Sequence, residues 1–258
     1  MIFCFSFLVC ETSFSRVPDI ASRLYSPLKE VADISFNINA PKVIELLNLK
    51  VNQSEKSKIS LQAFKFGKIK KINISGLKSN VKGLKKKIEK ILLSKINIVW
   101  GDDLINWLGT RKFVEEQSGW FTYVDEKALS DTTEIKIKFI NQNLQIVEKR
   151  PTGTLKANYT FVIKPWSKKR LVLEKVTRET YEGNQSITTD ISIEYAMVTK
   201  EIWAISNIQL ITQQKINVGE DEKVLRNIVE NFEFTNFRID KKSAQSWLEA
   251  QNLSKLIE

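Results

Sequence analysis

The residues in this chain that could do covalent chemistry are mainly serines followed three positions later by a lysine. In an S-x-x-K pair the lysine amine can act as a base for the serine hydroxyl, and enzymes that use such a pair also carry S-D-N and K-T-G motifs. Neither further motif occurs, and a chain rich in serine and lysine contains isolated pairs by chance. We therefore predict no catalytic role for the three pairs, which are Ser26 with Lys29, Ser75 with Lys78, and Ser79 with Lys82.

The other common catalytic groups are absent or poorly placed. The 258 residues include no histidine, which excludes histidine-based triads, H-E-x-x-H metalloproteases and histidine metal ligands. No G-x-x-x-x-G-K-[ST] or G-x-G-x-x-G phosphate-binding loop is present. Adjacent carboxylates at 102–103 and 115–116 point to different sides of any regular element, so we expect them to be cap and surface residues. The sequence thus predicts a protein that is not an enzyme and that has no cofactor or metal site.

Both cysteines, Cys4 and Cys10, lie in the apolar run MIFCFSFLVC at the amino terminus. The run has the length of a signal-peptide core, is too short to span a bilayer, and is followed by Ser13 and Ser15 as small residues before a cleavage point. We expect residues 1–16 to be a signal peptide and the protein to be periplasmic or otherwise exported. Because no lysine or arginine precedes the run, an N-terminal strand of a cytoplasmic protein remains the alternative.

The net charge of +10 is concentrated in one segment. Lys65–Lys95 holds eleven lysines and one acid, Glu89, so the rest of the chain is neutral on balance. Apolar residues recur there at i, i+4, i+7 and i+8 and predict the stripe of an amphipathic helix; they are Leu84, Ile88, Ile91 and Leu92. The lysines that we expect to face an anionic surface are Lys82, Lys85, Lys86 and Lys90.

Helices are predicted mainly in the first part of the chain. Pro41 suits the first position of a helix in PKVIELLNL, and a weaker helical pattern covers residues 20–31. Residues 59–74 alternate as a strand pair that bends at Gly67. The segment WGDDLINWLGTRKF predicts a short helix, capped by Asp102 or Asp103 and ending near Gly109. We expect this segment to carry aromatic side chains over one face of a sheet as a lid; these are Trp100, Trp107 and Phe113.

From Trp120 onward the pattern changes to strands. The odd-numbered residues from Ile187 to Met197 alternate with the residues between them, which is the period of a strand with one buried face. Similar segments follow one another at hairpin spacing, with turns predicted at 141–143, 151–153, 183–184 and 199–200. We predict an α+β fold, with a curved antiparallel meander and covering helices, in one domain over residues 17–240, followed by a C-terminal helix within 241–258.

The carboxyl-terminal half contains VLEKVTRETYEGNQSITTDISIEYAMVTKEIWAISNIQL and the later FEFTNFRID. In these two segments it resembles LolA-like outer-membrane lipoprotein-sorting proteins; the matching positions are Gly183, Ile193 to Tyr195, Trp203 to Ile205, Ile208 to Leu210, and Phe234 to Arg238. It implies a half-barrel whose apolar concave face, covered by helices, receives acyl chains. Function on this basis is an expectation, since fold analogy does not by itself transfer it.

Three hypotheses follow from these patterns. The first is an exported, monomeric carrier that binds a lipid or an acylated protein, with its lysines at an anionic membrane. The apolar cavity would then be lined by Trp107, Phe161, Ile163, Ile191, Ile193, Tyr195 and Trp203. The second is nonspecific nucleic-acid binding by Lys65–Lys95, which is disfavoured because the segment contains no arginine. The third is that the basic helix only solvates the domain while another surface acts.

Overall fold

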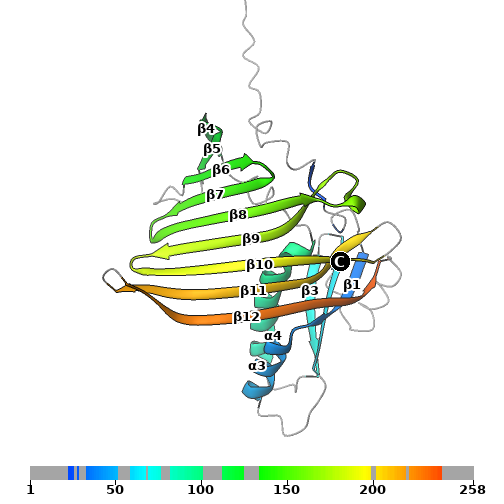
Figure 1. The fold of residues 1–258 in the computed structure, drawn as a ribbon. Helices are drawn as coiled ribbons and strands as arrows, with labels where there is room; N and C mark the ends of the chain where they lie inside the picture. Colours follow the sequence, from blue (N-terminus) through cyan, green and yellow to red (C-terminus); the bar gives the residue numbers. More distant parts are fainter. Residues whose placement is uncertain are drawn as a thin grey trace, which may run out of the picture.

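The computed structural model describes residues 23–25, 28, 33–51, 59–67, 69–76, 82–100, 112–124, 134–198, 202–218 and 221–239. Most of them belong to one open antiparallel sheet of 12 strands (Figure 1). The predicted signal peptide, the C-terminal helix and Trp107 lie outside the described residues. The predicted α+β class is therefore corrected toward a mostly β fold, in which helices with described bounds are few.

The helices are α3 (Pro41–Val51) and α4 (Lys82–Ile96), with short 3-10 turns at η3 (Asn97–Trp100) and η4 (Pro165–Ser167). The first strands are β1 (Asp33–Asn39), β2 (Ser60–Phe66), β3 (Ile69–Ser75), β4 (Lys112–Gln117), β5 (Trp120–Val124) and β6 (Glu134–Ile140). The remaining strands are β7 (Asn143–Arg150), β8 (Gly153–Ile163), β9 (Leu171–Glu182), β10 (Gln185–Met197), β11 (Trp203–Val218) and β12 (Asp221–Arg238).

The strand order is β3-β2-β1-β12-β11-β10-β9-β8-β7-β6-β5-β4. Strands β4 to β12 are consecutive neighbours, so local hairpins build this part of the sheet, as the sequence predicts. The turns at Asn141, at Gln142 and at Gly183 have the positive φ values that tight turns require. Strand β1 then adds to the far side of β12, with Ser35 opposite Arg238.

Two strands were missed by sequence reasoning. Strand β1 lies between the helical pattern at 20–31 and the helix predicted from Pro41, where no strand was predicted, although Ile34, Phe36 and Ile38 alternate and are buried. Phe113, expected in a helical lid, lies in the edge strand β4, where its ring contacts Tyr123 edge-on at 5.8 Å. Short strands carry a weak local signal, and one partner of β1, strand β12, is distant in the chain.

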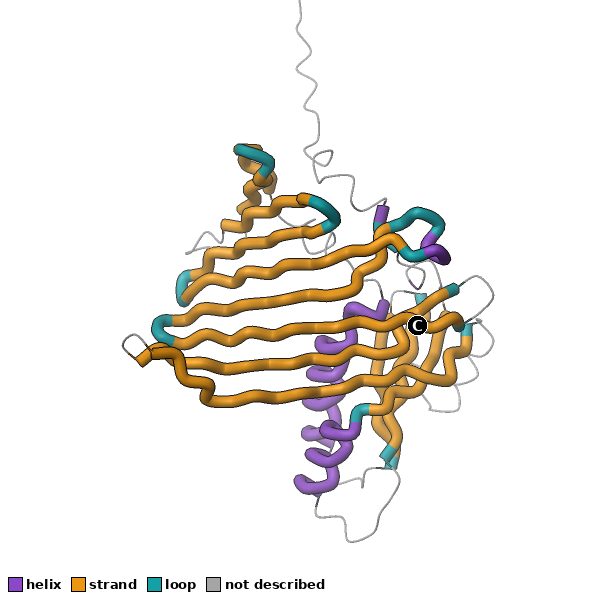
Figure 2. The backbone as a smooth tube through the Cα atoms, in the orientation of Figure 1, coloured by secondary structure: helices purple, strands orange, loops and turns teal. Residues whose placement is uncertain are grey.

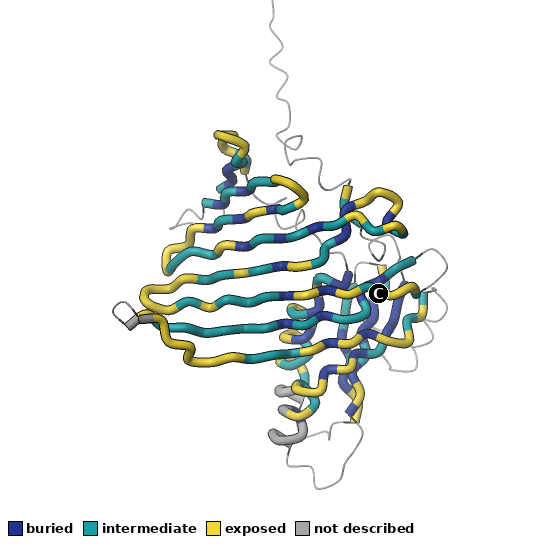
Figure 3. The backbone as a smooth tube through the Cα atoms, viewed as in Figure 1, coloured by how far each residue is buried: buried dark blue, intermediate teal, exposed yellow. Residues whose placement is uncertain are grey.

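One face of the sheet is the inner face, defined by the row Tyr159, Val176, Ile191 and Leu210 on neighbouring strands. Helix α4 crosses behind β10, β11 and β12 on this side, and β1 to β3 run across the direction of those strands (Figures 1 and 2). Buried residues gather where these elements overlap, while the far ends of β8 to β12 are mostly half-buried or exposed (Figure 3). The inner face is thus covered along only part of its length.

Helix α4 is held on the sheet by its apolar side and by η3. Leu92 and Ile96 are buried, whereas Ile91, expected in the same stripe, is 44% exposed. Beyond the helix, Trp100 packs on Phe36 of β1 with ring centroids 4.9 Å apart. No helix among the described ranges is long and apolar enough to cross a membrane.

Candidate functional site

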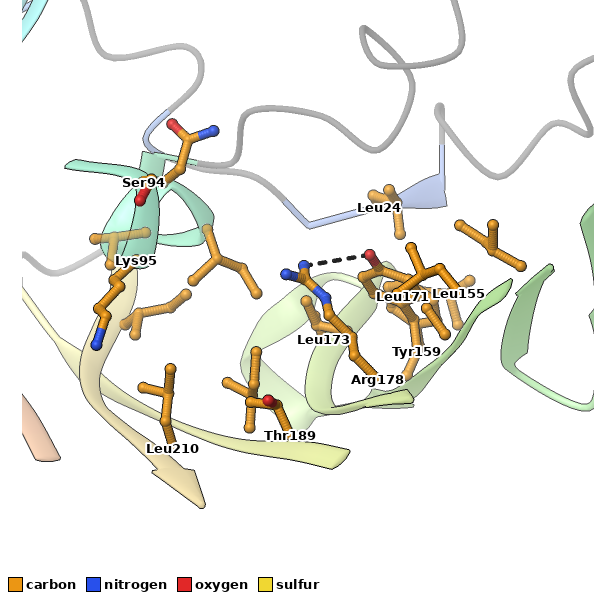
Figure 4. A pocket seen from close by; sticks show the side chains of 18 of the residues that line it. Leu24, Ser94, Lys95, Leu155, Tyr159, Leu171, Leu173, Arg178, Thr189 and Leu210 are labelled. Atoms are coloured by element: carbon orange, nitrogen blue, oxygen red, sulfur yellow. Dashed lines mark hydrogen bonds between the residues drawn. The ribbon is translucent and has the colours of Figure 1, made fainter. Parts of the chain in front are cut away.

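A cavity of about 740 Å³ lies between the inner face of β7 to β11 and the carboxyl end of α4 with η3 (Figure 4). Every second side chain of each strand lies on this face, because side chains alternate along a strand. From the other side, Ser94, Asn97 and Val99 border the space, together with Leu24. The cavity therefore exists because α4 and η3 cover only part of the inner face and leave a space between the helix end and the sheet.

One end of the cavity is apolar. Its wall comes from neighbouring strands and from Leu24 and Leu28, all on the covered side of the inner face. The residues are Leu24, Leu28, Phe161, Leu171, Leu173, Ile191, Ala204 and Ile205. A wall of this kind binds hydrocarbon by removing it from water.

Aromatic side chains organise this end. The Tyr195 hydroxyl donates a hydrogen bond to the Leu173 carbonyl oxygen at 3.0 Å. Burial, and then the neighbouring Tyr25, raises the pKa of Tyr195 above its ordinary value. The Trp166 ring centroid lies 5.5 Å from that of Tyr195, and the ring stacks on Trp203 at 4.8 Å. The backbone N–H of Trp203 donates to the Tyr25 hydroxyl at 3.1 Å. Tyr195 is thus fixed in the wall by both its ring and its hydroxyl.

The other end of the cavity carries charge. Glu148 is only 8% exposed, and Arg150 donates to its two carboxylate oxygens at 3.0 Å and 3.1 Å. This hydrogen bonding raises the pKa of Arg150. Away from this pair, Lys95 at the end of α4 donates to Glu230 of β12, which stands opposite Leu210 in the row of Ile191. These two ion pairs compensate two of the cations that line the cavity.

Arg178 is the third cation of the wall. It projects from β9, and its Nη2 donates to the Tyr159 hydroxyl at 3.4 Å, as drawn in Figure 4. Its guanidinium carbon lies 6.0 Å from the centroid of the same tyrosine ring. No described carboxylate pairs with Arg178, which is exposed, so water rather than a described acid of the protein meets its charge.

Three of the predicted cavity residues line the cavity: Phe161, Ile191 and Tyr195. The others that are described lie elsewhere. Ile193 is buried in the hydrophobic core, Ile163 is 51% exposed at the end of β8, and Trp203 stacks behind Tyr195 on Trp166. Periodicity identifies the face of a strand, but the position along the strand decides whether a side chain meets the core, the cavity or solvent.

Sequence reasoning missed the charged residues of the wall. In β7, Glu148 and Arg150 continue the phase of Leu144 and Ile146, and in β9 Arg178 continues the phase of Val176. A charged residue at a position that the period assigns to the buried face is the signal that could have found them.

The lysines of Lys65–Lys95 do not form one basic surface. Lys65 is 7% exposed and its Nζ donates to the Leu28 carbonyl at 2.7 Å, and burial lowers its pKa. Lys85 donates to Asn73 at 3.4 Å and lies 3.8 Å from Glu89. On α4, Lys86, Lys87 and Lys90 are exposed, and the side chain of Lys82 lies outside the described residues. A smaller basic patch on α4 is what reaches solvent.

Comparison with known proteins found no matching family model, no similar curated protein and no similar solved structure. Among the described residues, no group of three or more cysteine, histidine, aspartate or glutamate side chains could hold a metal ion. The cavity is consequently the feature on which a function can be argued.

Proposed function

We propose that the protein binds the acyl chain of a lipid or of an acylated protein in the cavity on the inner face of the sheet. The observation that carries the proposal is a space of about 740 Å³ with an apolar wall at one end and fixed polar groups at the other. Small-molecule sites occupy about 300–1,000 Å³ and have this mixture of walls. Each buried methylene contributes about 0.8 kcal/mol, so about ten would supply roughly 8 kcal/mol before the cost of ordering the ligand.

The resemblance of the carboxyl-terminal half to LolA-like lipoprotein-sorting proteins agrees with this proposal. On this basis the open sheet acts as a half-barrel and the protein is a carrier without enzymatic activity in the cell envelope. The matching Tyr195 and Ile205 both line the cavity. The proposal thus joins a motif found in the sequence to a space formed by the fold.

The same proposal assigns the exposed lysines of α4 to an anionic membrane surface. Lys86, Lys87 and Lys90 are exposed, and Ile91 beside them is 44% exposed. A lysine near an anionic lipid surface contributes about 1 kcal/mol, and an exposed apolar side chain adds to binding at the interface. Nucleic acid is not proposed as the partner because Lys65, Lys85 and Lys95 point into the protein's own contacts.

The experiment that tests acyl binding fills the cavity. Thr189 lines the cavity on β10, whereas Thr188 on the same strand faces the other side of the sheet. We expect full-length wild-type protein to bind dodecanoate in calorimetry and to retain lipid in native mass spectrometry. Thr189→Trp should weaken dodecanoate binding by about tenfold or more, because its ring occupies the space of several methylenes. Thr188→Trp is the matched control and should bind as wild type.

Circular dichroism and the unfolding midpoint show whether both variants fold. Acyl binding is refuted if wild-type protein binds no dodecanoate and carries no lipid from its own envelope. It is also refuted if a folded Thr189→Trp variant binds as tightly as wild type, since the chain would then lie elsewhere.

The membrane assignment is tested by sedimentation with vesicles that contain anionic phospholipid. The double substitution of Lys86 and Lys90 by glutamate should lower vesicle binding by about tenfold or more at low salt. The control for total charge is the double substitution of Lys168 and Lys169 by glutamate, since both lysines are exposed beside η4. Equal losses in the two double variants would show that only net charge matters and would remove α4 as the docking surface.

A further inference from the structure

We infer that the ligand is an amphiphile with an anionic head group, a carboxylate or a phosphate, and that Arg178 binds this group. The inference rests on the proposed acyl binding and names the class of ligand. Its basis is the distribution of charge in the cavity wall. An uncharged hydrocarbon needs only an apolar wall, whereas this wall also contains a cation that no described carboxylate pairs with.

The charges of the wall are matched except at one position. Arg150 is held by Glu148 through two hydrogen bonds, and Lys95 is held by Glu230. Arg178 has only the Tyr159 hydroxyl, at 3.4 Å, among the described residues. A guanidinium has five N–H donors in a planar fork that suits carboxylate and phosphate oxygens. Most of the donors of Arg178 are therefore available to a ligand.

The position of Arg178 along its strand matches the shape of an amphiphile. The inner-face residues of β9 run from Leu171 and Leu173 through Val176 to Arg178 and Thr180. The apolar part comes first, and the strand rise of about 3.3 Å per residue separates Leu171 from Arg178 by roughly 20 Å. An acyl chain lying along the wall thus has hydrocarbon partners over its length and a cation at its end.

The neighbours of Arg178 leave room for a head group. Across the strands it stands opposite Ala157 on β8 and Thr189 on β10, and both line the cavity. Alanine leaves space beside the guanidinium, and the hydroxyls of Thr189 and Thr180 supply further polar contacts. The Tyr159 ring under the guanidinium orients it, with the cation 6.0 Å from the centroid.

The test compares ligands that share a chain and differ in charge. Full-length wild-type, Arg178→Gln and Lys175→Gln proteins are titrated with dodecanoate, dodecyl phosphate, dodecanol and inorganic phosphate. Lys175→Gln is the matched control because it removes one positive charge from the outer side of the same strand. There Lys175 pairs with Asp190. We expect Arg178→Gln to weaken binding of the two anionic amphiphiles by about tenfold to a hundredfold and to leave dodecanol within about threefold. Lys175→Gln should match wild type with every ligand.

The outcomes separate this inference from the proposed function. Equal binding of dodecanol and dodecanoate, unchanged in a folded Arg178→Gln variant, would overturn the head-group inference while acyl binding stands. If none of the amphiphiles binds, the proposed function itself fails and the inference fails with it. If inorganic phosphate binds as tightly as dodecyl phosphate, Arg178 binds a free anion and the amphiphile is overturned. Selective loss of the anionic amphiphiles in Arg178→Gln alone supports the inference.

Discussion

Replacing Trp100 by alanine should destabilise the protein and should also loosen η3, which borders the cavity. Trp100 is 0% exposed, packs on Phe36 at 4.9 Å, and ends η3, whose residues Asn97, Ile98 and Val99 border the cavity. Truncating a buried tryptophan to alanine costs about 3–5 kcal/mol, because both the transferred surface and the cavity left behind count. Against a typical stability of about 5–15 kcal/mol this is a large fraction.

The indole nitrogen makes the prediction sharper. The Nε1–H of Trp100 is buried and donates to no acceptor in the described part of the chain. An unpaired buried donor costs about 1–3 kcal/mol, so phenylalanine, which keeps most of the ring and lacks the donor, should offset much of the lost packing. We expect Trp100→Phe to cost less than about 2 kcal/mol, well below Trp100→Ala.

Urea unfolding, followed by circular dichroism, measures the free energy of unfolding of both variants. Titration with dodecanoate measures whether the loss of Trp100 weakens ligand binding in the cavity. Trp120→Ala is the control, because Trp120 is half-buried on β5 under Lys138 and lies away from the cavity. Trp120→Ala should lower the free energy of unfolding by less than Trp100→Ala does, and it should leave dodecanoate binding unchanged. A loss below about 1 kcal/mol for Trp100→Ala, or equal losses for the alanine and phenylalanine variants, would refute the packing and the donor argument respectively.

Two further predictions concern pH and backbone space. Burial raises the pKa of Tyr195 above its ordinary 10.0, so the unfolded chain ionises first as pH rises and stability falls above about pH 10. Tyr195→Phe should make this decline shallower, measured as urea midpoints at about pH 8 and pH 11, and an equally steep decline would contradict it. At Gly153 an added Cβ would lie 1.8 Å from the Tyr181 carbonyl oxygen, so Gly153→Ala should lower the free energy of unfolding by about 2 kcal/mol or more. At Gly83 of α4, no described atom other than those of its chain neighbours and the helix backbone lies within 4 Å of such a Cβ, so Gly83→Ala should raise the free energy of unfolding by up to about 1 kcal/mol. A similar loss at both glycines would argue against the clash at Gly153.

Local features of the fold could be predicted because they depend on neighbouring residues. The alternation from Ile187 to Met197 became β10, the strand pair bends at Gly67 with a φ of +55°, and Pro41 begins α3. In each case the period or the turn chemistry is a property of the backbone over a few residues. The lysine-rich helix was predicted on the same basis and became α4, Lys82–Ile96.

The candidate site could be predicted only in part. Phe161, Ile191 and Tyr195 were placed on the cavity side because the period of a strand assigns its faces. The position of Arg178 on the inner face could have been found from a charged residue within an apolar phase, but this pattern gives no information on which carboxylates lie nearby. Glu148 of the same cavity wall pairs with Arg150, and no described carboxylate pairs with Arg178.

The sequence by itself determined the strands from Trp120 onward, the basic helix and the absence of histidine and thiol chemistry beyond residue 10. The tertiary structure alone decided that β1 closes against β12, with Ser35 opposite Arg238, and that the end of α4 stands off from the inner face to leave a cavity. The physical reason is range: hydrophobic period and turn residues act through adjacent peptide units. Strand order and cavity walls result from packing between segments that are distant in the chain, and no local pattern encodes this packing.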